Sequence, residues 1–285
     1  MTVPGAPTPR SVDLHMHSTA SDGVLSPAAV VAAAAKARLA LMCLTDHDTA
    51  GGVPEARAAG EALGIEVAAG IELSAHDGDK EVHLLGLHLA RLDVMEARAT
   101  EFRAARERRG AQMVATLNAH GIPIALDVVL AGAGGGALGR PHVARALIAG
   151  GWVRDMREAF DKWLGNGRPA CVEKERLDVA DAIALVHAAG GVAVFAHPGA
   201  DGDSARVERL AALGLDGLEI KHPSHTADEA ARLMLLCDAF DLVPSGGSDW
   251  HGYSNGPRVL GGMQVPWEWV ERQRERAERW TGQAA

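Results

Sequence analysis

The stretch that decides the fold is Asp13-Leu14-His15-Met16-His17-Ser18-Thr19-Ala20-Ser21-Asp22-Gly23. Apolar and polar residues alternate over residues 12–17, which predicts a short strand followed by a turn. His15 and His17 share one face of that strand, with Cα atoms roughly 6.6 Å apart, so both imidazoles could reach one metal ion. Asp13 lies behind them on the same face, and the turn adds another carboxylate at Asp22.

A His-x-His pair also occurs on strands that bind no metal, so a metal site requires further ligands on other strands. Apolar runs bounded by turn residues predict six more strands, at 41–45, 65–69, 81–89, 191–196, 215–220 and 242–248. Helical patterns separate most of them, so we expect a parallel α/β barrel or open α/β sheet with its active site at the carboxyl ends of the strands. Most of these apolar runs are followed by side chains that can bind metal ions. They are Asp46-His47-Asp48, Glu72, His197, Lys221-His222 and Asp249-Trp250-His251, and His83 lies within another run.

Composition sets the broad class of the protein. The chain has 285 residues, 47% apolar and 23% charged, which is typical of soluble globular proteins. Residues 1–10 lack the apolar segment of a signal peptide, and no apolar run is long enough to span a bilayer. Cys43, Cys171 and Cys237 are far apart, which fits a reducing compartment and argues against a thiolate metal site. We therefore expect a cytoplasmic protein with no membrane partner.

From about residue 98 the alternation of strands and helices gives way to helical segments and a glycine-rich loop. Residues 98–176 carry 13 Lys and Arg against 8 Asp and Glu, a net charge of +5, whereas the rest of the chain has a net charge of −14. A basic cap beside an acidic, metal-binding body would suit a phosphate-bearing substrate, although mixed charges also occur on ordinary solvated helices. We predict a barrel formed by 11–97 and 171–262, a helical insertion at 98–170, and a C-terminal helix within 263–285 that packs on the barrel.

The segment Gly139-Arg140-Pro141-His142 predicts the start of a helix, where free N–H groups and the helix dipole attract anions. Arg140 could bind a phosphate group through two parallel hydrogen bonds, and His142 could donate another. The alternative is an ordinary helix start with an incidental arginine.

Taken in order, the motifs resemble those of the polymerase-and-histidinol-phosphatase (PHP) family, and the resemblance covers residues 11 to about 262. They are Asp-x-His-x-His-Ser-x-x-Ser-Asp-Gly from residue 13, Thr-Asp-His-Asp from 45, Gly-x-Glu from 70, Glu-Val-His from 81, Ala-His-Pro from 196 and Ser-Asp-Trp-His-Gly from 248. The Gly139–His142 segment and Ala-Phe-Asp-Lys-Trp-Leu-Gly at 159–165 resemble one branch of the family. That branch contains the bacterial 3′,5′-nucleoside bisphosphate phosphatases, whose enterobacterial members also act as 5′-3′ exoribonucleases.

The resemblance implies a distorted (β/α)7 barrel with an inserted, mainly helical cap and up to three divalent metal ions. Mixed imidazoles and carboxylates without a thiolate suit Mn²⁺ above all, with Fe²⁺ or Zn²⁺ as alternatives. One ion would be bound by His15, His17, Glu72 and Asp249; a second by His83 and His197, with Glu72 bridging; and a third by Asp22, His47 and His251.

Metal-assisted hydrolysis of a phosphate ester predicts roles for other residues. Asp22 and His251 would act in the catalytic centre, and His222, at the end of a strand, could protonate the leaving oxygen. His222 could equally orient a ligand or bind phosphate. Asp13 and Asp46 are expected to orient the metal-binding imidazoles. Further candidates for binding a second phosphate or the base are Lys174, Lys221 and His225.

Three functions remain open at this point. The first is removal of the 3′-phosphate from nucleoside 3′,5′-bisphosphates, and the second is 5′-3′ trimming of short 5′-phosphorylated RNA. With 4% aromatic residues and a net charge of −9, we expect short substrates and no long duplex nucleic acid. The third is a non-catalytic, metal-binding regulatory domain, which the complete ligand set disfavours. Histidinol-phosphate phosphatase is a further enzymatic alternative, against which the Gly-Arg-Pro-His segment argues.

Overall fold

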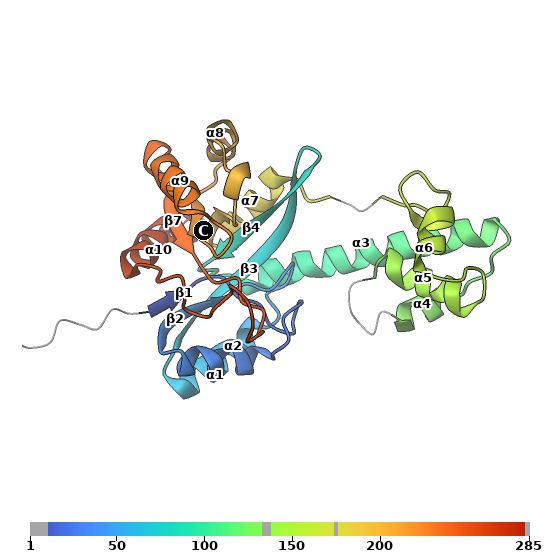
Figure 1. Ribbon diagram of the computed structural model, residues 1–285, viewed down its shortest axis with the longest axis horizontal. Coiled ribbons are helices and arrows are strands. Elements are labelled where there is room, and N and C mark those ends of the chain that lie inside the picture. Colours follow the sequence, from blue (N-terminus) through green and yellow to red (C-terminus); the bar gives the residue numbers. More distant parts are fainter. Residues whose placement is uncertain (1–10, 133–137, 174–175, 283–285) are drawn as a thin grey trace, which may run out of the picture. The chain divides into compact units, whose positions relative to one another are not determined.

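The computed structural model describes residues 11–132, 138–173 and 176–282 (Figure 1). The chain forms two compact units, one made of the segments before Ala97 and after Arg176 and the other of residues Ala97–Arg176. The first unit contains a seven-stranded sheet in the order β1-β2-β3-β4-β5-β6-β7. Its strands are β1 (Ser11–Asp13), β2 (Leu39–Leu44), β3 (Glu66–Asp77), β4 (Lys80–Leu87), β5 (Val192–Phe195), β6 (Gly217–Lys221) and β7 (Val243–Gly246).

The sheet is mainly parallel, and the predicted α/β class is confirmed. Strand β4 is the exception, because it pairs antiparallel with both β3 and β5. Only Gly78 and Asp79 connect β3 to β4, and two residues form a hairpin but are too few for a parallel crossover. The segment between β3 and β4 therefore reverses the chain.

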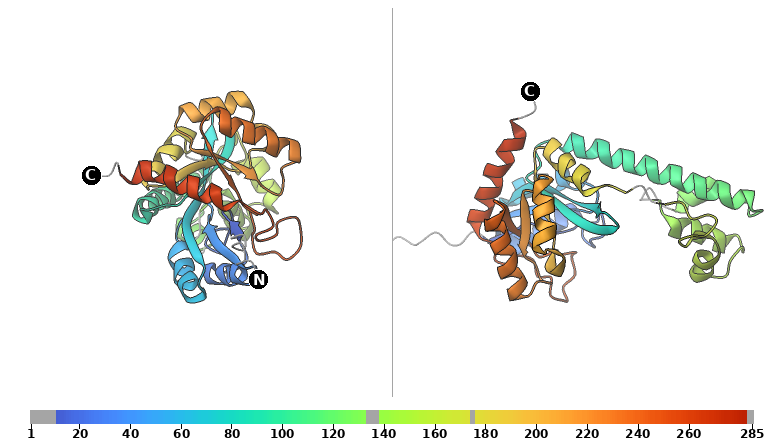
Figure 2. Two further views of the ribbon diagram at one scale, coloured as in Figure 1. Left: turned by 90° about the vertical axis from the view of Figure 1, so that its left-hand side faces the viewer. Right: turned by 90° about the horizontal axis from the view of Figure 1, so that it is seen from above.

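Helices pack around the sheet of the first unit (Figure 1, Figure 2). Ser26 caps the first helix, since its side chain accepts a hydrogen bond from the N–H of Ala29. Helix α7 packs on β3, β4 and β5, α9 on β6 and β7, and α10 on β7 and β5. The helices of this unit are α1 (Pro27–Lys36), α2 (Val53–Leu63), α7 (Val179–Ala188), α8 (Ser204–Ala212), α9 (Ala227–Ala239) and α10 (Trp267–Thr281), with a 3₁₀ turn at Gly199–Asp201.

Strand β1 is shorter than the predicted strand at 12–17, since it ends at Asp13. Beyond Asp13 the backbone hydrogen-bonds to the last residue of β7 and to the loop that follows it. Leu14 N–H donates to Gly246 O, and His17 N–H donates to Trp250 O. Met16 and Trp250 form an isolated parallel bridge, although no ladder between β1 and β7 is found in the described strands. These hydrogen bonds place His15 and His17 beside the loop that carries Asp249.

The second unit has a hydrophobic core of its own, which includes Leu117, Val143 and Leu147. Helix α3 (Leu92–Ala119) begins in the first unit and continues into the second, longer than the helix predicted from residue 98. None of the helices in the described ranges is both long and apolar enough to cross a membrane. The other helices of this unit are α4 (Leu126–Gly132), α5 (Arg140–Ala149) and α6 (Met156–Ala159), with a π-helical turn at Phe160–Leu164.

Replacing Gly247 by alanine should destabilise the first unit, because a Cβ there would lie 2.3 Å from His15 Cβ and 2.4 Å from His15 N. Backbone atoms cannot move away cheaply, so we expect a loss of about 1–3 kcal/mol in the free energy of unfolding. Urea denaturation measures it. Gly132→Ala is the control, since nothing lies within 4 Å of its added Cβ, and equal losses in both variants would contradict the packing described.

Candidate metal centre

Glu72, on β3, is the centre of a cluster of imidazoles, and its side chain is 1% exposed. Its Oε2 lies 3.1 Å from His15 Nε2 and 3.2 Å from His17 Nε2. Its Oε1 lies 2.9 Å from His83 Nδ1 and 3.0 Å from His197 Nε2. The two oxygens therefore face two different pairs of histidines, as a carboxylate that bridges two ions would.

The nine residues expected to bind metal all lie in or beside this cluster. Three groups have one potential ligand atom per residue within 4.8 Å of the others. His197 is outside these groups and joins the cluster through Glu72 Oε1. The groups are His15, His17, Glu72 and Asp249; His47, Glu72 and His83; and His17, Asp22, His47 and His251.

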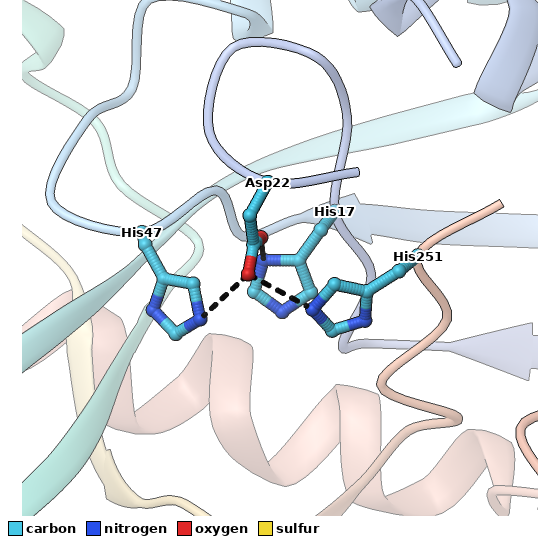
Figure 3. A group of neighbouring side chains, drawn as sticks. All are labelled: His17, Asp22, His47 and His251. Carbon is cyan, nitrogen blue, oxygen red and sulfur yellow. Dashed lines mark ion pairs between the residues drawn. The ribbon is translucent and has the colours of Figure 1, made fainter. Parts of the chain in front are cut away.

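The third group lies at the exposed edge of the cluster and is drawn in Figure 3. Asp22 extends from the turn after β1, with Oδ2 3.4 Å from His251 Nε2 and 3.8 Å from His47 Nε2. The Asp22 side chain is 54% exposed, whereas His17 is fully buried. Solvent, and therefore a substrate, can reach the cluster from this side.

Charge compensation dominates the buried part of the cluster. Burial alone would raise the pKa of Glu72, but the charge of His15 and hydrogen bonds from His15, His17 and His197 hold it well below its ordinary value. Burial lowers the pKa of His15, yet the charges of Glu219 and Glu72 outweigh it and raise that pKa well above the ordinary value. Protons on these imidazoles occupy the nitrogens that a divalent cation would use, so protons and metal ions compete for this site.

Comparison with known proteins places the chain in a family. The model of the PHP domain matches residues 13–122. A 3′,5′-nucleoside bisphosphate phosphatase from Chromobacterium violaceum is 38% identical over 88% of this chain and 90% of its own. The chain belongs to the PHP family. A 5′-3′ exoribonuclease from Haemophilus influenzae is also 38% identical, over 85% of this chain and 90% of its own.

A solved phosphoesterase structure supports the same assignment. A candidate metal-dependent phosphoesterase from Bifidobacterium adolescentis aligns with a TM-score of 0.68 and 32% identity, over 95% of this chain and 98% of its own. The family inferred from the motifs is thus confirmed, and the protein is a PHP hydrolase.

The residues present fit the divalent ions that PHP membership implies. Both ring nitrogens of His17 are buried, and Nδ1 has no hydrogen-bond partner among the described residues, which is costly unless another partner binds it. The donor set combines imidazoles and carboxylates, and all three cysteines lie outside it. This combination suits ions of intermediate hardness.

Glu219, which the sequence analysis overlooked, connects two parts of the cluster. It lies on β6, is fully buried, and accepts hydrogen bonds from His15 Nδ1 at 3.0 Å and from the N–H of His197 at 2.6 Å. A carboxylate behind a metal-binding histidine fixes the tautomer and orientation of its ring. Glu219 does this for His15, and it also restrains His197, whose φ of 31° is unfavourable for a residue with a side chain.

Asp13 and Asp46 accept hydrogen bonds from backbone N–H groups and serine hydroxyls, and among the described residues no hydrogen bond joins either carboxylate to an imidazole ring. Asp13 accepts hydrogen bonds from the N–H groups of Ser248 and Gly261 at 2.9 and 2.8 Å, and a longer one from His15 N–H. Asp46 accepts from Ser18 N–H and Oγ, both at 2.7 Å. These hydrogen bonds hold the loops that carry the metal-binding residues. Asp13 and Asp46 were expected to orient the imidazole rings directly, and the contacts found differ from that expectation.

His222 lies beside the cluster and is 4% exposed. Its Nδ1 accepts from Ser224 N–H, so Nε2 carries the proton and donates to Asp249 Oδ2 at 3.3 Å. His225 uses both ring nitrogens on the backbone, with Ile220 O and Gly199 N–H. Lys221 donates to Gln264 O.

The remaining predicted substrate residues belong to the second unit. Arg140 Nη1 donates to Leu164 O at 3.2 Å and to Asn166 Oδ1 at 3.0 Å, and Arg140 forms no ion pair in the described part of the chain. His142 Nδ1 accepts from Gly139 N–H. Lys174 lies outside the described residues.

Asp22→Asn should remove metal from the cluster while leaving the fold stable, because Asp22 is an exposed turn residue. We expect metal content per chain, measured by inductively coupled plasma mass spectrometry after dialysis, to fall by about one ion. Asp228→Asn on the surface of α9 is the matched control. Unchanged metal content in Asp22→Asn would contradict a role for this side chain in metal binding.

Proposed function

We propose that this protein is a metal-dependent phosphatase that hydrolyses the 3′-phosphate of nucleoside 3′,5′-bisphosphates, such as adenosine 3′,5′-bisphosphate, to leave nucleoside 5′-monophosphates. The observation that carries the proposal is the convergence of imidazoles and carboxylates on Glu72. Similarity to a named bisphosphate phosphatase over nearly the whole chain supports the substrate class.

The ligand set supports up to three ions, with Mn²⁺ preferred over Fe²⁺ and Zn²⁺. His15, His17, Glu72 and Asp249 would hold one, His83, His197 and Glu72 a second, and Asp22, His47 and His251 the third. When bound, such ions lower the pKa of water to generate a nucleophile and neutralise charge on the phosphate.

The chain's own residues would then orient the substrate and move protons. The exposed group around Asp22 and His251 is where the scissile phosphate would enter. His222 holds its proton at Nε2 beside Asp249, which suits a residue that orients Asp249. The same proton would pass to the leaving oxygen if His222 is the general acid.

Two residues of the second unit, Arg140 and His142, are further candidates for phosphate binding. Arg140 is not neutralised by a carboxylate in the described chain and lies at the start of α5, with His142 in the same first turn. An uncompensated guanidinium at a helix N-terminus favours an anion. Lys174 and His225 are weaker candidates for contacts with the same substrate.

A 5′-3′ exoribonuclease acting through the same site is the second candidate, because the relative from Haemophilus influenzae carries that name. The chemistry would be unchanged, with a phosphodiester in place of the phosphomonoester.

A side-by-side assay tests the proposal. Purified protein with Mn²⁺ is offered adenosine 3′,5′-bisphosphate, histidinol phosphate and a 5′-phosphorylated RNA pentamer, and release of phosphate or mononucleotide is measured. We expect the highest kcat/KM with the bisphosphate. A preference for the pentamer would favour the exoribonuclease, and inactivity on all three with metal bound would overturn both.

Arg140→Ala should reduce kcat/KM for the bisphosphate by the equivalent of about 1.5–3 kcal/mol, the contribution of hydrogen bonds to a charged group. Hydrolysis of adenosine 3′-monophosphate, which lacks the second phosphate, should change much less. Arg145→Ala on the same helix serves as control. Equal losses on the two substrates would exclude a contact between Arg140 and the second phosphate.

A further inference from the structure

One arginine reaches the cluster around Glu72 and has no role in the site described so far. Arg258 belongs to the loop that follows His251 in the chain and precedes α10. Its Nη2 lies 2.6 Å from Asp249 Oδ2, and its Nη1 lies 3.2 Å from His251 Nδ1. Its side chain is 46% exposed. The guanidinium therefore touches the cluster on one side and solvent on the other.

Asp249 has other partners that compensate its charge. Its Oδ1 lies 3.1 Å from His17 Nε2, and its Oδ2 accepts a hydrogen bond from His222 Nε2. An ion bound by the group that contains Asp249 would neutralise this carboxylate further. The positive charge of Arg258 would then be in excess and available to an anion.

Arg258 also differs from the other basic residues in pairing with a carboxylate of the cluster. Among the ion pairs of the described residues, it is the one Lys or Arg that pairs with Asp22, Glu72 or Asp249. Its two contacts use at most two of the five N–H donors of a guanidinium. The transferring phosphoryl group spreads negative charge over its oxygens, and a fixed guanidinium stabilises such charge better than a mobile ammonium does.

We propose that Arg258 is a further catalytic residue, which donates hydrogen bonds to the non-bridging oxygens of the phosphate under attack. The inference rests on the proposed function, since it assumes a phosphate ester as substrate. The oxygen of a water molecule bonds to phosphorus and that water gives up one proton, while the bond from phosphorus to the leaving oxygen breaks and that oxygen takes up one proton. Arg258 exchanges no proton and stabilises the charge on the oxygens that remain on phosphorus.

A purely structural role would have a different signature. If Arg258 only held Asp249 in place, its removal would release metal, and the affinity for phosphate would fall as a consequence. If it binds the anion, metal content stays constant while phosphate affinity falls.

Isothermal titration of inorganic phosphate into Mn²⁺-loaded protein separates these cases without requiring turnover. For Arg258→Ala we expect wild-type metal content, a Kd for phosphate about 10- to 100-fold higher, and a similar loss in kcat/KM. Arg258→Lys keeps the charge without the planar fork and should fall in between. Arg274→Ala, on α10 and paired with Glu66, is the control and should match wild type.

Unchanged phosphate affinity in Arg258→Ala would overturn the proposal, as would metal loss that parallels the loss of phosphate binding. A wild-type protein that binds no phosphate when loaded with Mn²⁺ would overturn it too. Failure of the proposed function has a distinct result: wild type binds phosphate through Arg258 but hydrolyses none of the nucleotides offered.

Discussion

A single buried carboxylate sets the arrangement of the first unit. Glu72 can remain ionised inside the protein only if positive charge surrounds it, since an uncompensated buried charge is very costly. His15, His17, His83 and His197 supply that environment from segments far apart in the sequence. Divalent ions would supply it more completely. Residues within β4 and residues that follow β1 and β5 therefore meet around β3, so fold and site depend on the same contact.

The sequence allowed much of this site to be anticipated, because ligand types at the carboxyl ends of strands converge wherever strands run parallel. His47 after β2, His197 after β5 and Asp249 after β7 follow that rule. His83 does not, since it lies within the antiparallel β4, and its position follows from the hairpin that pairs it with Ser74. The short connection Gly78-Asp79 carried the signal for that reversal.

Glu219 was not anticipated for a different physical reason. It lies in the middle of β6 between Leu218 and Ile220, where the sequence indicates only a buried strand. A carboxylate in such a run needs a buried partner, and its presence could have indicated one. Which partner it meets depends on the register between β6 and its neighbours, and alternation along the chain does not determine that register. The predicted strand at 12–17 was too long for a similar reason, because Leu14 and His17 hydrogen-bond to Gly246 and Trp250 outside the regular ladder with β2.

The two units differ in how their expected residues are held. Around Glu72, the backbone at His197 and Asp249 adopts positive φ. Each is restrained by a hydrogen bond that its own N–H donates, to the Glu219 carboxylate from His197 and to His15 O from Asp249. Such strain persists only where surrounding structure enforces it. In the second unit, Arg140 and His142 are held by ordinary helix and loop contacts. At His197 and Asp249 the strained backbone therefore lies directly beside the side chains that would bind metal.

The ligand group that contains Asp22 is more exposed to solvent than the group around Glu72, because Asp22 extends from a surface turn. Glu72 is 1% exposed and Asp22 is 54% exposed, so an ion at the edge would exchange with bulk solution faster than an ion enclosed by Glu72. Under scarcity of metal, the edge position would empty first while the interior remains filled. Such a hydrolase would keep its fold yet lose turnover, and its rate would follow the supply of free cation in its surroundings.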